Sequence, residues 1–151
     1  IIFYDGIEFS KENLIAKFPS RSEDFINSLQ QSSLNEVLKE ADIVSVHIPL
    51  LKETQNLISS DELACLKKDA RIINTSRGGI VDEKALEEFL NKNQNAFAAF
   101  DVFEKEPAFN HPLLKLNNFY ATSHLGSMTI EGVISMGLAA INGLDENRIP
   151  L

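Results

Sequence analysis

The sequence predicts an α/β protein built on a doubly wound, mainly parallel sheet with helices on both faces. Short apolar runs alternate with amphipathic segments along most of the chain, which is the pattern of buried parallel strands joined by helices. Charged residues follow several of these runs, where a doubly wound sheet brings the carboxyl ends of its strands to one crevice. At 151 residues and 44% hydrophobic content, the chain is long enough for one domain with a core and too short for two large ones.

Five apolar runs are the expected strands, because each is short and is bounded by polar or turn-forming residues. They are Ile1–Tyr4, Ile43–Val46, Arg71–Asn74, Phe97–Phe100 and Phe119–Ala121.

Capping signals place the starts of the helices between these strands. Ser33 is followed three residues later by Glu36, which is the spacing of a capping box. Ser59 and Glu62 repeat that spacing, and Asp82 can cap a helix whose apolar residues recur at helical intervals. The last helix is expected over about residues 129–144, and residues 6–32 predict one or two short helices or a long excursion.

Composition limits the class of protein. The formal charge of −8 and the pI near 4.8 argue against a nucleic-acid partner or an anionic membrane surface, both of which attract clustered Lys and Arg. No apolar stretch approaches the roughly 18 residues of a membrane span. The single cysteine, Cys65, cannot form an internal disulfide and is expected in the core. A cytoplasmic protein without a metal site is therefore expected.

Three charged residues at strand ends form the candidate catalytic group. Arg77, Glu106 and His124 each follow an expected strand, so a doubly wound sheet should bring them together. A guanidinium fits a substrate carboxylate, a histidine moves a proton, and a carboxylate orients that histidine. Two of them have a plainer interpretation: Arg77 as a surface turn residue, and Glu106 as part of an acidic loop in which Glu104 competes for the same role.

Other strand ends carry candidate cofactor ligands. Asp5 can accept hydrogen bonds from the adenosine ribose and repel a 2′-phosphate, which favours NAD over NADP, although by itself it reads as a turn aspartate before a glycine. His47 is expected to be a structural residue, while Pro49 directs the chain so that nearby backbone groups can face a cofactor. Asp101 ends a strand where a nicotinamide carboxamide could be reached.

Several motifs occur together in one order, and their combination is more specific than any one of them. They are Ala41-Asp42-Ile43-Val44 before His47-Ile48-Pro49-Leu50, then Ile73-Asn74-Thr75-Ser76-Arg77-Gly78-Gly79 with Val81-Asp82, then Asp101-Val102-Phe103 with Glu106-Pro107, and His111-Pro112-Leu113-Leu114 before Thr122-Ser123-His124-Leu125-Gly126-Ser127. From Ile1 to about Leu144 the chain therefore resembles the Rossmann-like NAD-binding domain of the D-isomer-specific 2-hydroxyacid dehydrogenases.

This resemblance implies roles for the matching residues. It implies that Arg77 binds the substrate carboxylate, Glu106 is the acid partner and His124 is the catalytic histidine. It also implies NAD as cofactor. The implied cofactor ligands, together with the two from the second strand end, are Asp5, His47, Pro49, Thr75, Ser76, Arg77, Asp101, His124, Gly126 and Ser127.

One part of the family pattern has no counterpart, since the sequence contains no G-x-G-x-x-G motif and no strand to precede it. We therefore expect residues 1–151 to be a partial NAD-binding domain, with its final helix leading back toward a substrate domain outside the chain. In the strand order 3-2-1-4-5-6 the missing strand is the central one. We expect it between the strands ending at Asp5 and Asn74. Its absence should leave two sheet halves that either stay apart or close into a different pairing, and should give an inactive fragment without pyrophosphate binding.

The expected function is interconversion of a D-2-hydroxy acid and a 2-oxo acid, with hydride exchanged with NAD in a homodimeric enzyme. Glycerate, phosphoglycerate, lactate and glyoxylate chemistry all remain open, because the discriminating residues belong mostly to the substrate domain. Two alternatives remain: an NAD-sensing dimeric binding protein of the same fold without turnover, and a structural fragment without ligand affinity.

Overall fold

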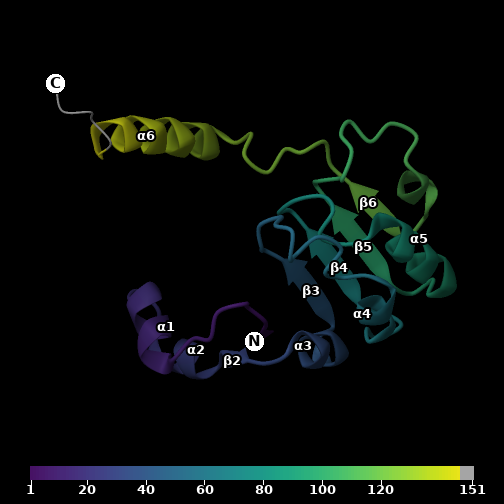
Figure 1. Ribbon diagram of the computed structural model, residues 1–151, viewed down its shortest axis with the longest axis horizontal. Coiled ribbons are helices and arrows are strands. Elements are labelled where there is room, and N and C mark those ends of the chain that lie inside the picture. Colours follow the sequence, from purple (N-terminus) through teal and green to yellow (C-terminus); the bar gives the residue numbers. More distant parts are fainter. Residues whose placement is uncertain (147–151) are drawn as a thin grey trace.

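The computed structural model describes residues 1–146, whose strands form two separate parallel sheets (Figure 1). In the smaller sheet, β1 (Ile2–Phe3) pairs with β2 (Gln30–Gln31). The larger sheet has the order β3-β4-β5-β6, and all its neighbouring strands are parallel. Its strands are β3 (Ile43–Val46), β4 (Arg71–Asn74), β5 (Phe97–Phe100) and β6 (Phe119–Ala121). These four expected strands are confirmed residue for residue, and the fold class is confirmed.

The strand β2 was not predicted. Gln30 and Gln31 are polar and lack the apolar alternation that identifies a strand in sequence. Their pairing depends on the backbone of β1: the N–H of Gln30 donates to the carbonyl of Ile1, and the N–H of Ser32 donates to that of Phe3, both at 2.9 Å. Only a neighbouring strand makes this segment a strand.

The two sheets stay separate, which is one of the two alternatives expected, but the strands on either side of the gap were wrongly assigned. The gap lies beside β3, because β4 is already flanked by β3 and β5. The error follows from the missed strand: once β2 is counted, β3 takes the fourth place in the order 3-2-1-4-5-6. A cavity of about 630 Å³ lies between β1, α3 (Leu34–Glu40) and β3.

The predicted caps are present at the starts of the crossover helices. Ser33 and Glu36 form both bonds of the capping box at α3, since the N–H of Glu36 donates to Ser33 Oγ at 3.4 Å and the N–H of Ser33 donates to Glu36 Oε2 at 3.1 Å. Asp82 accepts two backbone N–H groups at the start of α5 (Glu83–Lys92). At α4 (Ser60–Ala64) the N–H of Ser59 donates to Glu62 at 3.1 Å.

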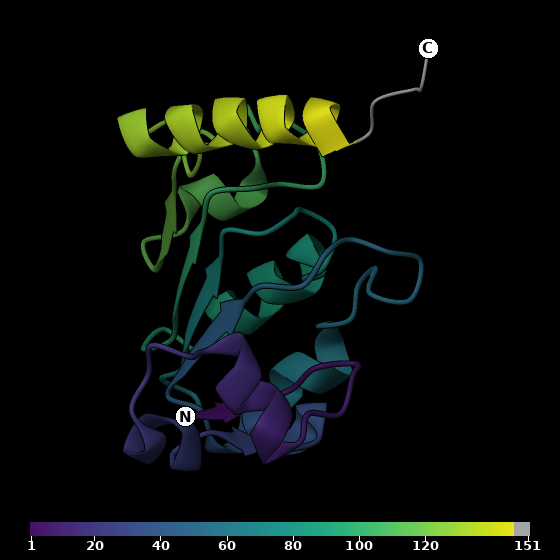
Figure 2. The ribbon, with the colours of Figure 1, turned by 90° about the vertical axis from the view of Figure 1, so that its left-hand side faces the viewer.

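The core lies on one face of the larger sheet. Alternate strand residues are buried against α4 and α5, where Leu63, Leu86 and Leu90 are almost completely buried. Burying one such side chain stabilises the fold by about 1.5–3 kcal/mol. The opposite face is open, with Ile43 59% and Tyr120 60% exposed. The expectation that helices cover both faces is therefore wrong for this sheet. Each successive strand is added on the same side of the one before it, and right-handed connections then place all their helices on one face (Figure 2).

Residues 6–32 contain two short helices, which confirms the first of the two alternatives expected for this region. They are α1 (Lys11–Lys17) and α2 (Glu23–Asn27), and a 3-10 turn, η1 (Pro112–Lys115), precedes β6. The last helix, α6 (Ile130–Glu146), begins one residue later and ends two residues later than expected. It lies apart from both sheets with exposed apolar residues (Figure 1). Cys65 is half-buried against the core. No helix among the described residues is long and apolar enough to cross a membrane.

Candidate active site

The loops after β4, β5 and β6 bring Arg77, Glu106 and His124 to one cleft of about 270 Å³. These loops leave the carboxyl ends of adjacent parallel strands, so residues well separated in sequence share one rim. Leu50 and Val102 are among the apolar residues that line the same cleft. The three charged residues therefore have the proximity that a common reaction would require.

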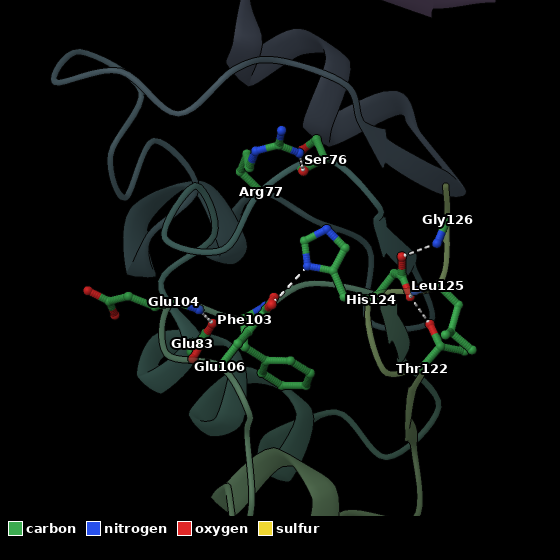
Figure 3. Close-up of polar contacts among 11 residues, drawn as sticks. Ser76, Arg77, Glu83, Phe103, Glu104, Glu106, Thr122, His124, Leu125 and Gly126 are labelled. Carbon is green, nitrogen blue, oxygen red and sulfur yellow. Dashed lines mark hydrogen bonds and ion pairs between the residues drawn. The ribbon is translucent and has the colours of Figure 1, made fainter. Parts of the chain in front are cut away.

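His124 and Glu106 are directly bonded. The Nδ1 atom of His124 lies 2.8 Å from Oε2 of Glu106, and the N–H of Phe103 donates to Oε1 at 2.9 Å. These two bonds hold the pKa of the Glu106 carboxyl below its usual value, and the bond with His124 has the larger effect. If Nδ1 carries the proton to the carboxylate, Nε2 of the neutral ring is a free base, and it faces away from Glu106, on the side of Arg77 (Figure 3).

Lowering the pH is expected to break this contact. The pKa of Glu106 is lowered in the folded state, so the contact stabilises the fold above the ordinary carboxyl value of about 4.3 and is lost as the pH falls through the lowered pKa. The pair is exposed, so the effect is small. The measurement is the denaturant midpoint across this acid range, which should fall more for wild type than for Glu106→Gln. Parallel declines of the two proteins would contradict it.

The backbone of His124 is held in the left-handed region. Its φ is 56°, a conformation that non-glycine residues seldom adopt and that costs about 1–2 kcal/mol. Asp101 stabilises the surrounding loop: its carboxylate accepts the N–H groups of Leu125 and Gly126, each at 2.8 Å, and the hydroxyl of Thr122. The loop that carries His124 into the cleft is therefore held in place by Asp101.

Asp101 has a structural role that the sequence did not reveal. Burial alone would raise its pKa, but the hydrogen bonds from Thr122, Leu125 and Gly126 outweigh burial and leave the pKa below its usual value. The N–H of Gly126 is one of these donors, so in this structure it is already bonded within the protein. The expected cofactor contacts of Asp101 and Gly126 remain predictions.

Arg77 is exposed, and its turn is organised by Asn74. The buried Asn74 amide donates to the carbonyl of Arg77 at 2.9 Å and accepts from the N–H of Ser76 at 3.1 Å. The Nη1 atom of the guanidinium donates to the carbonyl of Ser76 at 2.7 Å (Figure 3). Most of its five donors therefore stay available to an anion. The amide at the end of a buried strand was the signal for this turn.

Gly78 allows this turn to pack directly on the loop after β5. A Cβ atom at Gly78 would lie 1.9 Å from the carbonyl carbon of Phe103 and 2.2 Å from the nitrogen of Glu104. A glycine at this position permits a close approach of two chain segments. The partner is protein backbone.

Of the two candidate acids, Glu106 is the one beside His124. Glu104 points its side chain away from the histidine, and its N–H donates to Glu83 at 2.6 Å (Figure 3). Glu106 also precedes Pro107, and the backbone of a residue before a proline has fewer allowed conformations.

Asp5 and His47 lie together, but in the gap between the two sheets and outside the cleft of His124. Oδ1 of Asp5 accepts the N–H of Ile7 at 3.0 Å, as a turn aspartate does. His47 Nε2 lies 2.7 Å from Ser45 Oγ, which agrees with a structural histidine. Pro49 is exposed, and its carbonyl accepts the hydroxyl of Thr54. Thr75 and Ser127 are exposed near the cleft loops.

Comparison with known proteins decides the family. The family model described as D-isomer specific 2-hydroxyacid dehydrogenase, NAD binding domain, matches residues 12–126. The chain belongs to this family. It is 43% identical over 104 residues to the D-3-phosphoglycerate dehydrogenase of Methanocaldococcus jannaschii, covering 69% of this chain and 20% of that protein. It is 45% identical over 122 residues to the glyoxylate reductase of Thermofilum pendens, covering 80% of this chain and 36% of that protein.

Solved structures give the same result. The holo form of D-mandelate dehydrogenase from Rhodotorula graminis superposes with a TM-score of 0.80 at 28% identity, covering 95% of this chain and 39% of that one. The D-lactate dehydrogenase of Lactobacillus jensenii, solved with NAD⁺, superposes with a TM-score of 0.70 at 30% identity, covering 91% and 43%. The chain thus spans less than half the length of these relatives.

NAD is the cofactor of this domain family, and the residues present fit it in part. The gap lined by Asp5 and His47 adjoins the end of β1, where a carboxylate can accept ribose hydroxyls. The cleft of Arg77 and His124 provides room for the reacting end. A glycine-rich turn for the pyrophosphate is absent from the printed sequence.

Proposed function

We propose that this chain forms the larger part of the NAD-binding domain of an enzyme that interconverts a D-2-hydroxy acid and a 2-oxo acid. The observation that carries the proposal is the contact of 2.8 Å between His124 Nδ1 and Glu106 Oε2 in a cleft that Arg77 also lines. A histidine held by a carboxylate beside a cation suits a substrate with an ionised carboxyl group and a hydroxyl that must exchange a proton.

When bound, NAD supplies or accepts the hydride, and the residues of this chain handle the proton and the charge. In the reduction direction, Nε2 of protonated His124 gives its proton to the oxygen on C2. Glu106 keeps the ring in one orientation and stabilises its positive charge through Nδ1. In the oxidation direction, neutral His124 takes the hydroxyl proton at Nε2.

Arg77 positions the substrate in this proposal. Its guanidinium has a planar array of N–H donors that matches a carboxylate in two-point geometry. Asn74 and Gly78 hold the backbone on either side of it, so the arginine is presented from a turn of defined shape. Fixing the carboxylate places C2 near His124 and lowers the entropy loss on reaching the transition state.

Replacing Arg77 with alanine is expected to raise KM for a 2-oxo acid about 10- to 100-fold, because a charge-assisted bond of about 1.5–3 kcal/mol is removed. Steady-state kinetics of the complete enzyme gives the measurement. Arg71→Ala is the matched control, since Arg71 is an exposed arginine at the opposite end of β4. An unaltered KM in Arg77→Ala would remove Arg77 from substrate binding.

The substrate is proposed to be glycerate, phosphoglycerate, lactate or glyoxylate with their oxidised or reduced partners. The relatives named above include a glyoxylate reductase and a phosphoglycerate dehydrogenase, which support this range. We also propose a cytoplasmic homodimer in which α6 leads toward a substrate domain. Light scattering of the complete protein would test the dimer.

The deciding experiment follows NADH consumption by the complete enzyme with glyoxylate, hydroxypyruvate, phosphohydroxypyruvate and pyruvate. Turnover with at least one of them, abolished when the carboxylate is replaced by an amide, is expected. Tight NAD binding without turnover of any 2-oxo acid would favour the alternative of an NAD-sensing protein. Calorimetry with NAD on residues 1–151 would further show whether this part binds the cofactor alone.

A further inference from the structure

The turn that carries Glu106 is held from two sides. On one side, Gly78 lies against the peptide that joins Phe103 and Glu104, since a Cβ atom added at Gly78 would lie 1.9–2.2 Å from the atoms of that peptide. On the other side, the N–H of the same peptide donates to Glu83 Oε1 at 2.6 Å. Glu83 is in the first turn of α5, a helix that belongs to the core. The peptide is thus fixed between the Arg77 turn and a rigid element.

Glu83 has a second partner, His111. His111 Nε2 lies 3.0 Å from Glu83 Oε2, and the N–H of Leu113 donates to His111 Nδ1 at 3.3 Å. With Nδ1 accepting from the backbone, Nε2 is the ring nitrogen that donates to Glu83. Both carboxylate oxygens of Glu83 therefore accept a bond from a defined donor, one from backbone and one from a ring.

This pair is more enclosed than the His124–Glu106 pair. The side chain of Glu83 is 10% exposed and that of His111 24%, against 37% for Glu106 and 46% for His124. The His111 ring packs on Phe103 at a centroid distance of 5.3 Å. A carboxylate enclosed to this degree is tolerated because it is hydrogen-bonded, and burial raises its pKa in spite of those bonds. The bonds of Glu83 to His111 and to the N–H of Glu104 show that it holds the peptide of residues 103 and 104 in place.

We propose that Glu83 and His111 are positioning residues that keep the 103–106 turn in the shape in which Glu106 holds His124. The catalytic consequence rests on the function proposed above, whereas the positioning itself does not. Neither residue touches the cleft chemistry directly. They act through the backbone of residues 103 and 104.

The transmission is short and follows bonded groups. The N–H of Phe103 donates to Glu106 Oε1, which closes the turn from residue 103 to residue 106. The next N–H, of Glu104, is the one bound by Glu83. When Glu83 is removed, this peptide loses the partner that sets its orientation. The turn then relaxes, and both hydrogen bonds of the Glu106 carboxylate weaken together.

The test compares Glu83→Ala and His111→Asn with Glu88→Ala, an exposed glutamate of the same helix. Asparagine can still accept the N–H of Leu113 as a cap but is too short to keep the bond to Glu83. Nitrogen-15 NMR reports the tautomer of His124, and carbon-13 NMR reports the pKa of the Glu106 carboxyl. Neither readout requires turnover.

In the wild-type protein, His124 is expected in the Nδ1–H tautomer and Glu106 with a lowered pKa. Glu83→Ala should shift His124 toward the Nε2–H tautomer and raise the Glu106 pKa toward its usual value. His111→Asn should do the same to a smaller extent, and Glu88→Ala should leave both unchanged. If Glu83→Ala does not fold, His111→Asn gives the result. Glu83→Gln keeps an acceptor for the N–H of Glu104 and should therefore leave both readouts close to wild type.

In the complete enzyme, Glu83→Ala and His111→Asn should lower kcat about tenfold or more, because the contact that orients His124 is disturbed. Both should leave the affinity for NADH within about twofold, because the cofactor contacts are not disturbed. Folded Glu83→Ala and His111→Asn variants whose His124 tautomer and Glu106 pKa match wild type would overturn the proposal. A shifted tautomer in an enzyme that shows no turnover with any 2-oxo acid would support the positioning role and count against the proposed function instead.

Discussion

Replacing His124 with asparagine is expected to lower kcat of the complete enzyme by about two to four orders of magnitude, the range that a positioned acid–base group contributes. Asparagine removes the titrating ring but tolerates positive φ, so the backbone angle of 56° at this position can be kept. The variant therefore separates the loss of proton transfer from the loss of loop geometry. Steady-state kinetics with a 2-oxo acid and NADH gives the measurement.

Ser123→Ala is the control for this experiment. Ser123 is the exposed neighbour of His124 in the same loop, whereas the bonds from this loop to Asp101 and Glu106 come from Thr122, His124 and Leu125. Its kcat should stay within about twofold of wild type. Near wild-type turnover in His124→Asn would exclude His124 from the mechanism, and a folded protein with an intact thermal transition is required for either result.

Replacing Gly78 with alanine is expected to disturb the fold and the site together. The added methyl group would lie 1.9 Å from the carbonyl carbon of Phe103, and backbone cannot move aside as a flexible side chain does. Overpacking of this kind costs about 1–3 kcal/mol of unfolding free energy, which corresponds to a fall in Tm of several degrees. The turn of Arg77 and the turn of Glu106 would be pushed apart, so kcat should fall and KM for the 2-oxo acid should rise.

Gly137→Ala is the matched control, because a Cβ at Gly137 in α6 would meet nothing within 4 Å. Alanine favours helix by up to about 1 kcal/mol relative to glycine, so this variant should keep or slightly raise Tm. Calorimetric Tm and the kinetic constants are measured for both proteins. Equal Tm and equal kinetics for Gly78→Ala and wild type would show that the two turns do not pack as closely as described.

Local signals in the sequence predicted the elements that are strong by themselves. Four parallel strands follow from short apolar runs, and the starts of α3 and α5 follow from Ser33 and Asp82, because a cap is satisfied within one helical turn. The motifs also placed Arg77, Glu106 and His124 at strand ends. Parallel pairing then required these strand ends to meet, which is why the cleft could be predicted without coordinates.

Other features depend on contacts that no local pattern encodes. β2 is a strand only through its pairing with β1, and missing it led to the wrong neighbour for the gap between the sheets. The open face of the larger sheet reflects the direction of its crossovers, which becomes visible once the strand order is known.

The sequence by itself determined the family, the residue ranges of the four strands of the larger sheet and the residue types at their ends. Only the tertiary structure showed that Asp101 holds the His124 loop and that Glu83 contacts both His111 and the N–H of Glu104. The physical reason is range: caps and apolar runs act within one element, whereas a hydrogen bond between residues about 20 positions apart exists only after the strands have paired and set the distance.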